Sequence, residues 1–385
     1  MAPELALETL RSLNPASTVL DPMAGSGTVL RHAAEMGHKA IGRDLDPLAV
    51  LMARVWTTKC DASAVRRTYE RIVKKANSLD GDKVALPWID GDAEAVAFTK
   101  YWFGATQRRV LRSIAYAIAS EQRASQSKSD FAALDVVRVA LSRIIVTKEQ
   151  CASLARDTSH SRPHKVAQRS SYDVYEGFAR SLNSVLEKLL RFPVPKGSEV
   201  RISEGDARKT RLKSESIDAV LTSPPYLNAI DYMRGHRMSL IWFGYSLALL
   251  REVRGCAIGT ERGLRKADFD VLKLKTSFGD LDRLTRRDSS MFDRYIRDVC
   301  AMVTESARVL RKGGCATFVV GNSCLRGVYV RNAEVVAAAA ELAGLVEKRR
   351  YDRDLPNHSR YLPTSSPRLA KRMRSETILS FVKPN

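Results

Sequence analysis

Two short segments carry residue types that could do chemistry, and each follows a run of apolar residues. The first, residues 21–28, reads DPMAGSGT and comes directly after Thr18-Val19-Leu20. The second, Ser223-Pro224-Pro225-Tyr226, follows the largely apolar stretch 216–221 after the single residue Thr222. Short apolar runs bounded by turn residues indicate buried strands, and open α/β sheets bind ligands beyond the carboxyl ends of their strands. We therefore expect both segments at the ligand-binding edge of one sheet.

The DPMAGSGT segment predicts a site for a nucleoside-bearing ligand. Gly25 and Gly27 lie between a strand end and a helix start, where glycine lets the backbone approach a ligand and the helix N-terminus offers free N–H groups. Asp44 follows the next strand, where a carboxylate reaches ribose hydroxyls. The segment lacks the spacing of phosphate-binding loops, and acidic Asp21 suits a cationic or zwitterionic ligand such as S-adenosylmethionine. The competing interpretation is a tight turn that binds nothing.

The SPPY segment has the groups needed to hold an amino group attached to a planar ring. Two successive prolines fix the backbone, so the Pro224 carbonyl can accept a hydrogen bond from an NH₂ group, and the Ser223 hydroxyl can accept another. Tyr226 offers a flat face on which an extruded base can stack, a contact worth roughly 1–3 kcal/mol. A conjugated amine is a poor nucleophile, so the protein would chiefly supply alignment and electrostatics. The alternative is a proline-rich strand exit with an exposed Tyr.

Together, DPMAGSGT, the second-strand sequence IGRDLDP and TSPPY resemble the amino-methyltransferases that modify DNA at cytosine N4 or adenine N6. The resemblance covers about half of the chain, chiefly residues 3–56, 199–245 and 300–325. It implies S-adenosylmethionine as cofactor, double-stranded DNA as partner, and catalysis by the four SPPY residues Ser223, Pro224, Pro225 and Tyr226. It also implies that the cofactor is bound by Asp21, Pro22, Ala24, Gly25, Ser26, Gly27, Thr28, Asp44 and, near the adenine, Asp206.

The first residue of the SPPY segment bears on the target base. Ser at this position resembles the cytosine-N4 members more than typical adenine-N6 members, so we expect transfer to N4 of cytosine. Many cytosine-N4 enzymes place SPPY before the glycine loop, whereas this chain has the reverse order. Adenine-N6 methylation of DNA, amino-methylation of a base in RNA, and a nucleic-acid-binding protein with a vestigial methyltransferase fold are the alternatives. A cognate restriction endonuclease is left open as a further partner.

The composition agrees with a nucleic-acid partner and argues against several other classes. The 385 residues carry 63 Lys+Arg against 43 Asp+Glu, a formal net charge of +20, which is typical of proteins that neutralise phosphates. The six cysteines form no C-x-x-C pair, and His160 with His164 is too small a ligand set, so no zinc site is expected. No cysteine follows Pro, which argues against methylation at cytosine C5, because that reaction needs an attacking thiolate, typically from a Cys after Pro. No apolar run approaches the roughly 20 residues of a membrane-spanning helix. We expect a cytoplasmic, nucleoid-associated protein without a metal.

The rest of the sequence predicts the elements that must position these segments. Strands alternate with helices towards both ends of the chain, which predicts an α/β fold with a Rossmann-like doubly wound methyltransferase sheet. We expect residues 1–59 and 196–385 to form the methyltransferase domain. Residues 60–195 have helical periodicity and many basic side chains, and predict a large helical insertion that takes part in DNA target recognition. Residues 348–374 carry nine basic and two acidic side chains, which predicts a DNA-contacting edge or a solvated basic face.

Overall fold

The computed structural model describes residues 3–156, 163–227, 231–259, 278–279, 284–325, 327–354 and 375–385. The chain divides into two compact units. The first comprises Met1–Ala53, Pro195–Ile230 and Val253–Asn385, and the second comprises Arg54–Val194 and Asp231–Glu252. Both predicted segments, DPMAGSGT and SPPY, therefore belong to the first unit.

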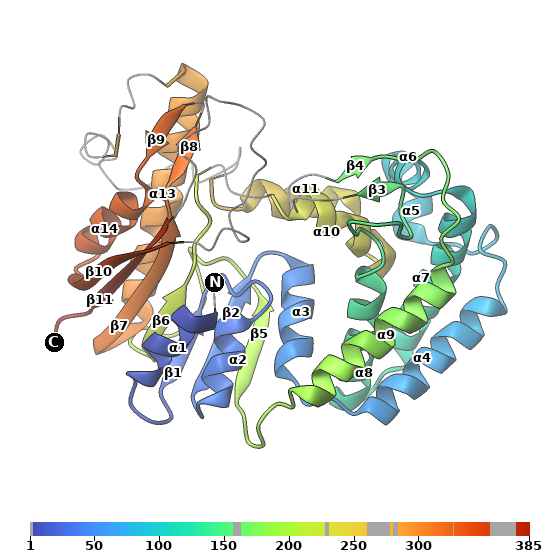
Figure 1. The fold of residues 1–385 in the computed structure, drawn as a ribbon, viewed down its shortest axis with the longest axis horizontal. Helices are drawn as coiled ribbons and strands as arrows, with labels where there is room; N and C mark the ends of the chain where they lie inside the picture. The colour runs from blue at the N-terminus through green and yellow to red at the C-terminus, as the bar shows by residue number, and fades with distance from the viewer. Residues whose placement is uncertain are drawn as a thin grey trace. The chain divides into compact units, whose positions relative to one another are not determined.

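The first unit is built on a seven-stranded sheet with the strand order β10-β11-β7-β6-β1-β2-β5 (Figure 1). The strands are β1 (Thr18–Asp21), β2 (Lys39–Asp44), β5 (Val200–Glu204), β6 (Ile217–Thr222), β7 (Leu310–Gly321), β10 (Val346–Asp354) and β11 (Ser375–Val382). Strands β5, β2, β1, β6 and β7 run parallel, whereas β11 lies antiparallel between β7 and β10. This mostly parallel sheet confirms the predicted Rossmann-like α/β class.

Helices cover both faces of the sheet because successive residues of a strand point to opposite sides. Val19 of β1 lies in an apolar cluster with residues of the helices α1, α2 and α3. The next residue, Leu20, lies in a different cluster with residues of α13 and α14. The helices are α1 (Pro3–Arg11), α2 (Thr28–Glu35), α3 (Pro47–Thr57), α13 (Arg286–Val309) and α14 (Asn332–Leu342). The sheet is therefore doubly wound, as the sequence predicts.

Helix α13 packs against the sheet through one apolar stripe. Phe292, Ile296, Val299 and Val303 recur every three or four residues and are at most 1% exposed. Burying each such side chain contributes about 1.5–3 kcal/mol. This apolar stripe holds the helix on the sheet and delivers the chain directly into β7, which begins at Leu310.

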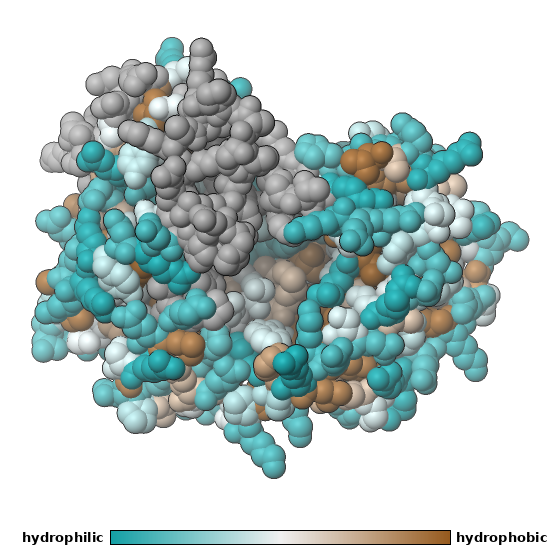
Figure 2. Space-filling view, in the orientation of Figure 1, coloured by the Kyte–Doolittle hydropathy of each residue, from teal (hydrophilic) through white to brown (hydrophobic). Residues whose placement is uncertain are grey.

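The second unit is mainly helical. Its elements in chain order are α4 (Ala62–Asn77), α5 (Pro87–Asp90), α6 (Ala93–Trp102), α7 (Ala105–Ala124), α8 (Lys128–Ser142), the short strands β3 (Ala155–Arg156) and β4 (His164–Lys165), α9 (Val174–Arg191), α10 (Met233–Leu240), the 3₁₀ turn η1 (Ile241–Phe243) and α11 (Leu247–Cys256), whose end passes into the first unit. Figure 2 shows mostly hydrophilic side chains over α4, α7 and α9. A helical body with a polar surface agrees with an insertion that faces solvent or a polar partner.

Residues 231–252 cluster with this helical unit, although the sequence assigned them to the methyltransferase domain. The Trp242 ring is fully buried and meets Phe103 edge-on, with 5.0 Å between ring centroids. The Trp88 indole N–H donates to the Ile241 carbonyl over 2.7 Å. These long-range aromatic contacts fix the segment to the insertion, and no local sequence pattern reveals them.

Strand β10 is missing from our sequence-based prediction because its sequence, VEKRRYDRD, lacks an apolar run. It is an edge strand, and its arginines form ion pairs: Arg349 with Glu8 at 2.6 Å and Arg350 with Glu334 at 2.7 Å. Exposed pairs of this kind contribute little to stability. The part of the predicted basic edge that covers residues 355–374 lies outside the described residues.

Candidate functional site

The two chemically interesting segments begin at the ends of neighbouring strands. Strand β1 pairs with β6 in parallel, with Val19 opposite Ala219 and Leu20 opposite Val220. At their carboxyl ends the Thr222 hydroxyl donates to Asp21 Oδ1 over 2.7 Å. From β1 the chain proceeds to β2 on one side, whereas β6 starts the other half of the sheet, so this is the topological switch point at which α/β sheets bind ligands.

Asp21 is a buried carboxyl group at this switch point. Its side chain accepts hydrogen bonds from Thr222 and from the Met23 N–H, and the residue is only 4% exposed. Burial raises the pKa of Asp21 to about 6, because the hydrogen bonds from Thr222 and Met23 only partly offset desolvation, and the nearby Asp44 charge raises it further. Burial therefore destabilises the charged form of Asp21, and a cation bound nearby would offset this cost. This agrees with the cationic ligand expected from the sequence.

The glycine loop is held by backbone contacts and by unusual glycine conformations. The Ala24 N–H donates to the Arg43 carbonyl of β2 over 2.9 Å. Gly25 and Gly27 have φ values of +50° and +87°, which side chains other than glycine rarely adopt. A Cβ atom on Gly27 would lie 2.9 Å from the Ala53 Cβ, whereas a Cβ atom on Gly25 would meet nothing within 4 Å. Gly27 is thus required for helix packing, while Gly25 borders open space.

Asp44, at the end of β2, is joined to the same loop. Its Oδ2 atom accepts from the Gly25 N–H over 2.8 Å, and its Oδ1 atom accepts from the Asp46 N–H over 2.9 Å. These two bonds orient the Asp44 carboxylate beside the glycine loop. The structure therefore brings together the glycine loop and the acidic residue that the sequence paired with it.

Asp206 follows β5 and is fixed by Arg208. The Arg208 guanidinium donates to Asp206 Oδ2 over 2.7 Å, to the buried Asp298 Oδ1 over 2.6 Å and to the Cys256 carbonyl over 2.7 Å. Burial lowers the pKa of Arg208, but hydrogen bonds and charge from Asp206 and Asp298 outweigh this effect and raise it above the ordinary value. The Asp206 carboxylate is thus held in one orientation at the edge beside Asp44.

The SPPY segment leaves β6 with its two polar side chains anchored to the far half of the sheet. The Ser223 hydroxyl donates to the Val319 carbonyl of β7 over 3.0 Å. The Tyr226 hydroxyl donates to Glu376 Oε1 of β11 over 3.2 Å. Pro224 is buried, and Pro225 is half-buried between these anchored residues. The segment is therefore fixed by two hydroxyl groups, one donating to β7 and the other to β11.

The remaining predicted site residues lie in the glycine loop. Pro22 and Ala24 are buried, Ser26 is exposed, and Thr28 is the first residue of α2. Three partners of these residues were not predicted from the sequence: Thr222, Arg208 and Glu376. Thr222 stands within the TSPPY motif, so its position was visible, but its bond to Asp21 requires the strand pairing. Arg208 and Glu376 give no sequence signal, because their partners are set by the tertiary fold.

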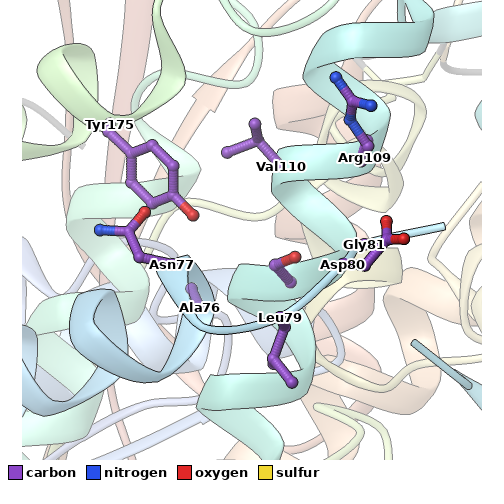
Figure 3. A pocket seen from close by; sticks show the side chains of 9 residues that line it. Ala76, Asn77, Leu79, Asp80, Gly81, Arg109, Val110 and Tyr175 are labelled. Atoms are coloured by element: carbon purple, nitrogen blue, oxygen red, sulfur yellow. The ribbon is translucent and has the colours of Figure 1, made fainter. Parts of the chain in front are cut away.

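A separate pocket lies in the second unit (Figure 3). Its cavity volume is about 320 Å³, and its lining includes Asn77, Arg109 and Tyr175. None of the predicted site residues lines it. Figure 3 shows that the Arg109 guanidinium does not point at the Tyr175 ring. We therefore do not place the candidate site in this pocket.

Two kinds of feature are absent from the described part of the chain. Across the described ranges, no three His, Cys, Asp or Glu side chains are grouped so that they could hold a metal ion. His160 of the His pair considered above lies outside those ranges. In the same residues, no helix has both the length and the apolar character needed to cross a membrane.

Comparison with known proteins points to methyltransferases, although no family model matches the chain. Over 300 residues the chain is 22% identical to the type II methyltransferase M.BsoBI of Geobacillus stearothermophilus, with coverage of 71% of this chain and 57% of that protein. The chain thus spans little more than half the length of this curated relative. The similarity confirms the resemblance to DNA methyltransferases that the motifs predicted.

Similar solved structures include a TehB-like SAM-dependent methyltransferase from Corynebacterium glutamicum, at 8% identity over 98% of this chain and 87% of that chain, with a TM-score of 0.32. A Thermus thermophilus protein named as a DNA modification methylase is 17% identical over 47% of this chain and 52% of that chain, with a TM-score of 0.26. Because these TM-scores are low, the fold assignment depends on the strand order of this protein itself.

Proposed function

We propose that this protein is a DNA methyltransferase that transfers a methyl group from S-adenosylmethionine to the exocyclic N4 amine of cytosine. The observation that carries the proposal is the Asp21–Thr222 hydrogen bond of 2.7 Å, which joins the glycine-loop strand to the SPPY strand at the switch point. The 22% identity to a type II methyltransferase supports the reaction class. Ser223 at the head of SPPY supports cytosine N4 over adenine N6.

The residues around the glycine loop fit S-adenosylmethionine. When bound, this molecule would supply an electrophilic methyl group on a sulfonium cation. Asp44 would accept hydrogen bonds from the ribose hydroxyls, and Asp206 would face the adenine. The open space beside Gly25 leaves room for a ligand close to the backbone. Asp21 would supply negative charge near the cationic part, where its desolvation cost is repaid by the cation.

The SPPY residues fit an amino group on an extruded base. The single hydroxyl proton of Ser223 is committed to the Val319 carbonyl, so the lone pairs of Oγ are available to accept from the amine. The Pro224 carbonyl would accept the second amine proton, and Tyr226 would stack on the ring. Hydrogen-bond acceptors fixed before the substrate arrives would retain electron density on the amine nitrogen while the N–CH₃ bond forms and the S–CH₃ bond of the donor breaks. The methylated amine would then lose one proton to solvent.

The helical unit is assigned to DNA target recognition. Tyr101 is 53% exposed, and the Lys165 ammonium lies 4.6 Å from its ring centroid. An exposed aromatic ring next to a cation is a combination that nucleic-acid surfaces use for stacking and phosphate contact. The similarity to a type II methyltransferase also supports a partner restriction endonuclease, which DNA methylated by this protein would resist.

Nucleoside analysis tests the reaction. The purified protein is incubated with S-adenosylmethionine carrying a labelled methyl group and with unmethylated genomic DNA, and the DNA is then digested to nucleosides. We expect label in N4-methylcytosine. Label in N6-methyladenine would refute the base assignment alone, whereas label only in a parallel RNA sample would refute the DNA substrate.

The Ser223→Ala variant tests the assigned role of the SPPY hydroxyl. Removing a preorganised hydrogen-bond partner of the reacting group should lower kcat by about 100-fold while leaving the cofactor affinity unchanged. Ser380→Ala is the matched control, because the Ser380 hydroxyl forms a 3.2 Å contact with Thr317 in the same sheet and is assigned no role in the reaction. Equal rates for the two variants would contradict the role.

A further inference from the structure

Glu376 is a carboxylate outside every predicted motif that contacts the SPPY segment. It is the second residue of β11 and accepts a hydrogen bond from the Tyr226 hydroxyl over 3.2 Å. The two residues are 150 positions apart in the sequence. This contact connects the proposed base-stacking ring to β11.

The antiparallel direction of β11 explains why Glu376 reaches this edge. The parallel strands β6 and β7 bring their last residues to the ligand-binding edge, whereas an antiparallel neighbour brings its first residues there. In the observed register Glu376 lies opposite Gly321, the last residue of β7. A carboxylate at the start of β11 is therefore placed beside the SPPY turn by the topology of the sheet.

The second oxygen of Glu376 is held in a costly state. Its Oε2 atom is buried and has no hydrogen-bond partner within the described residues. Burying a carboxylate oxygen without a partner lowers the stability of the fold, so its presence calls for an explanation. A neutral or apolar residue at this position would make the fold more stable. The carboxylate is therefore best explained by the hydrogen bond that its Oε1 atom accepts from Tyr226.

We propose that Glu376 is a positioning residue that fixes the Tyr226 ring for the extruded base. This inference rests on the proposed methyl transfer. The hydroxyl bond restricts rotation of the ring, and Tyr226 also packs against the apolar cluster around α13. A phenol that donates to a carboxylate also gains electron density in its ring, which favours positive charge developing on a nitrogen at the ring face. The 3.2 Å bond is long for O–H···O, as hydrogen bonds at active sites often are before substrate binds.

A double-mutant cycle on the full-length protein tests this role. The variants are Tyr226→Phe, Glu376→Ala and the double variant, with Glu376→Gln as the conservative change that retains an acceptor oxygen. We expect Tyr226→Phe and Glu376→Ala each to lower kcat about tenfold, without change in the affinity for S-adenosylmethionine. The double variant should be no slower than either single variant, and Glu376→Gln should retain at least a third of the wild-type kcat.

A second readout separates positioning from simple destabilisation. DNA with 2-aminopurine at the target position reports base extrusion by its fluorescence, and Glu376→Ala should reduce this signal. The matched control is Asp352→Ala, because Asp352 accepts from the adjacent Thr377 over 2.6 Å on the same pair of strands. Thermal unfolding of both variants shows whether the sheet is equally affected. If Glu376→Ala does not fold, Glu376→Gln and Tyr226→Phe complete the comparison.

The outcomes distinguish this inference from the proposed function. If the wild-type protein methylates DNA and Glu376→Ala reacts at the wild-type rate, the inference is wrong and the function stands. Losses that multiply in the double variant would also overturn it, because Glu376 would then act independently of Tyr226. A wild-type protein that transfers no methyl group to DNA or RNA would overturn both.

Discussion

Replacing Asp21 by Asn should stabilise the fold and weaken cofactor binding. Asp21 is 4% exposed, and burial raises its pKa to about 6 from an ordinary value of 3.8. The difference corresponds to about 3 kcal/mol between the two protonation states. Asn keeps an acceptor oxygen for Thr222 and Met23 but carries no charge, so the substitution removes the desolvation cost and retains the local hydrogen bonds.

The sign of the pH dependence follows from the direction of the shift. Because the pKa is higher in the folded state, the folded protein binds more protons than the unfolded chain between about pH 4 and 6. The stability contribution of Asp21 is therefore fully present below pH 4 and is lost as the pH rises through 6. At pH 7.5 we expect Asp21→Asn to be more stable than the wild type by up to about 3 kcal/mol, and at pH 4 the two should be equal.

Urea unfolding across this pH range measures the stability difference, and titration calorimetry measures the affinity for S-adenosylmethionine. The wild-type affinity should increase from pH 5 to 7 as Asp21 ionises, whereas the affinity of Asp21→Asn should be weaker at pH 7.5 and independent of this titration. Asp218→Asn is the control, because Asp218 lies near the opposite end of β6 and bonds to the Thr18 N–H. An Asp21→Asn variant that is less stable than the wild type at pH 7.5, or that binds the cofactor equally well, would refute the reasoning.

Two further predictions concern the same edge of the sheet. Gly27→Ala should destabilise the fold by about 2–4 kcal/mol, because it combines a positive φ with a clash against Ala53. Gly25→Ala should lower the stability by only about 1 kcal/mol and should mainly weaken cofactor binding. Thermal unfolding measures the stability of both variants and calorimetry their cofactor affinity, and a larger loss of stability in Gly25→Ala would be inconsistent with the geometry. Arg208→Met should lower stability by about 3 kcal/mol, because the buried Asp298 loses this cation, and adding Asp298→Asn should recover part of the loss in urea unfolding. No recovery in the double variant would argue against this ion pair as the cause.

Local sequence was sufficient to place both candidate segments at strand ends. The apolar residues Val19 and Leu20 are followed by an acidic residue and then by glycines. This pattern predicts a buried strand, a turn and a helix from a few neighbouring positions, without information from the rest of the chain. The SPPY segment was visible for the same reason, since two prolines end a strand wherever they occur. The fold class followed from the alternation of strands and helices.

Local sequence was misleading where the determining contacts are distant. Strand β10 is charged because an edge strand needs few apolar residues, so its sequence resembles a basic surface segment. Residues 231–252 were assigned to the wrong side of the unit boundary because the burial of Trp242 depends on Phe103, which lies far away in the chain.

The sequence by itself determined which residues end the strands β1, β2 and β6, because turn residues and apolar runs act over a few positions. Only the tertiary structure decided that β1 and β6 are neighbours, that Thr222 bonds to Asp21, and that an antiparallel last strand brings Glu376 to Tyr226. The physical reason is that strand order and direction come from packing the helices on both faces of the sheet, a property of the whole chain that no short segment encodes.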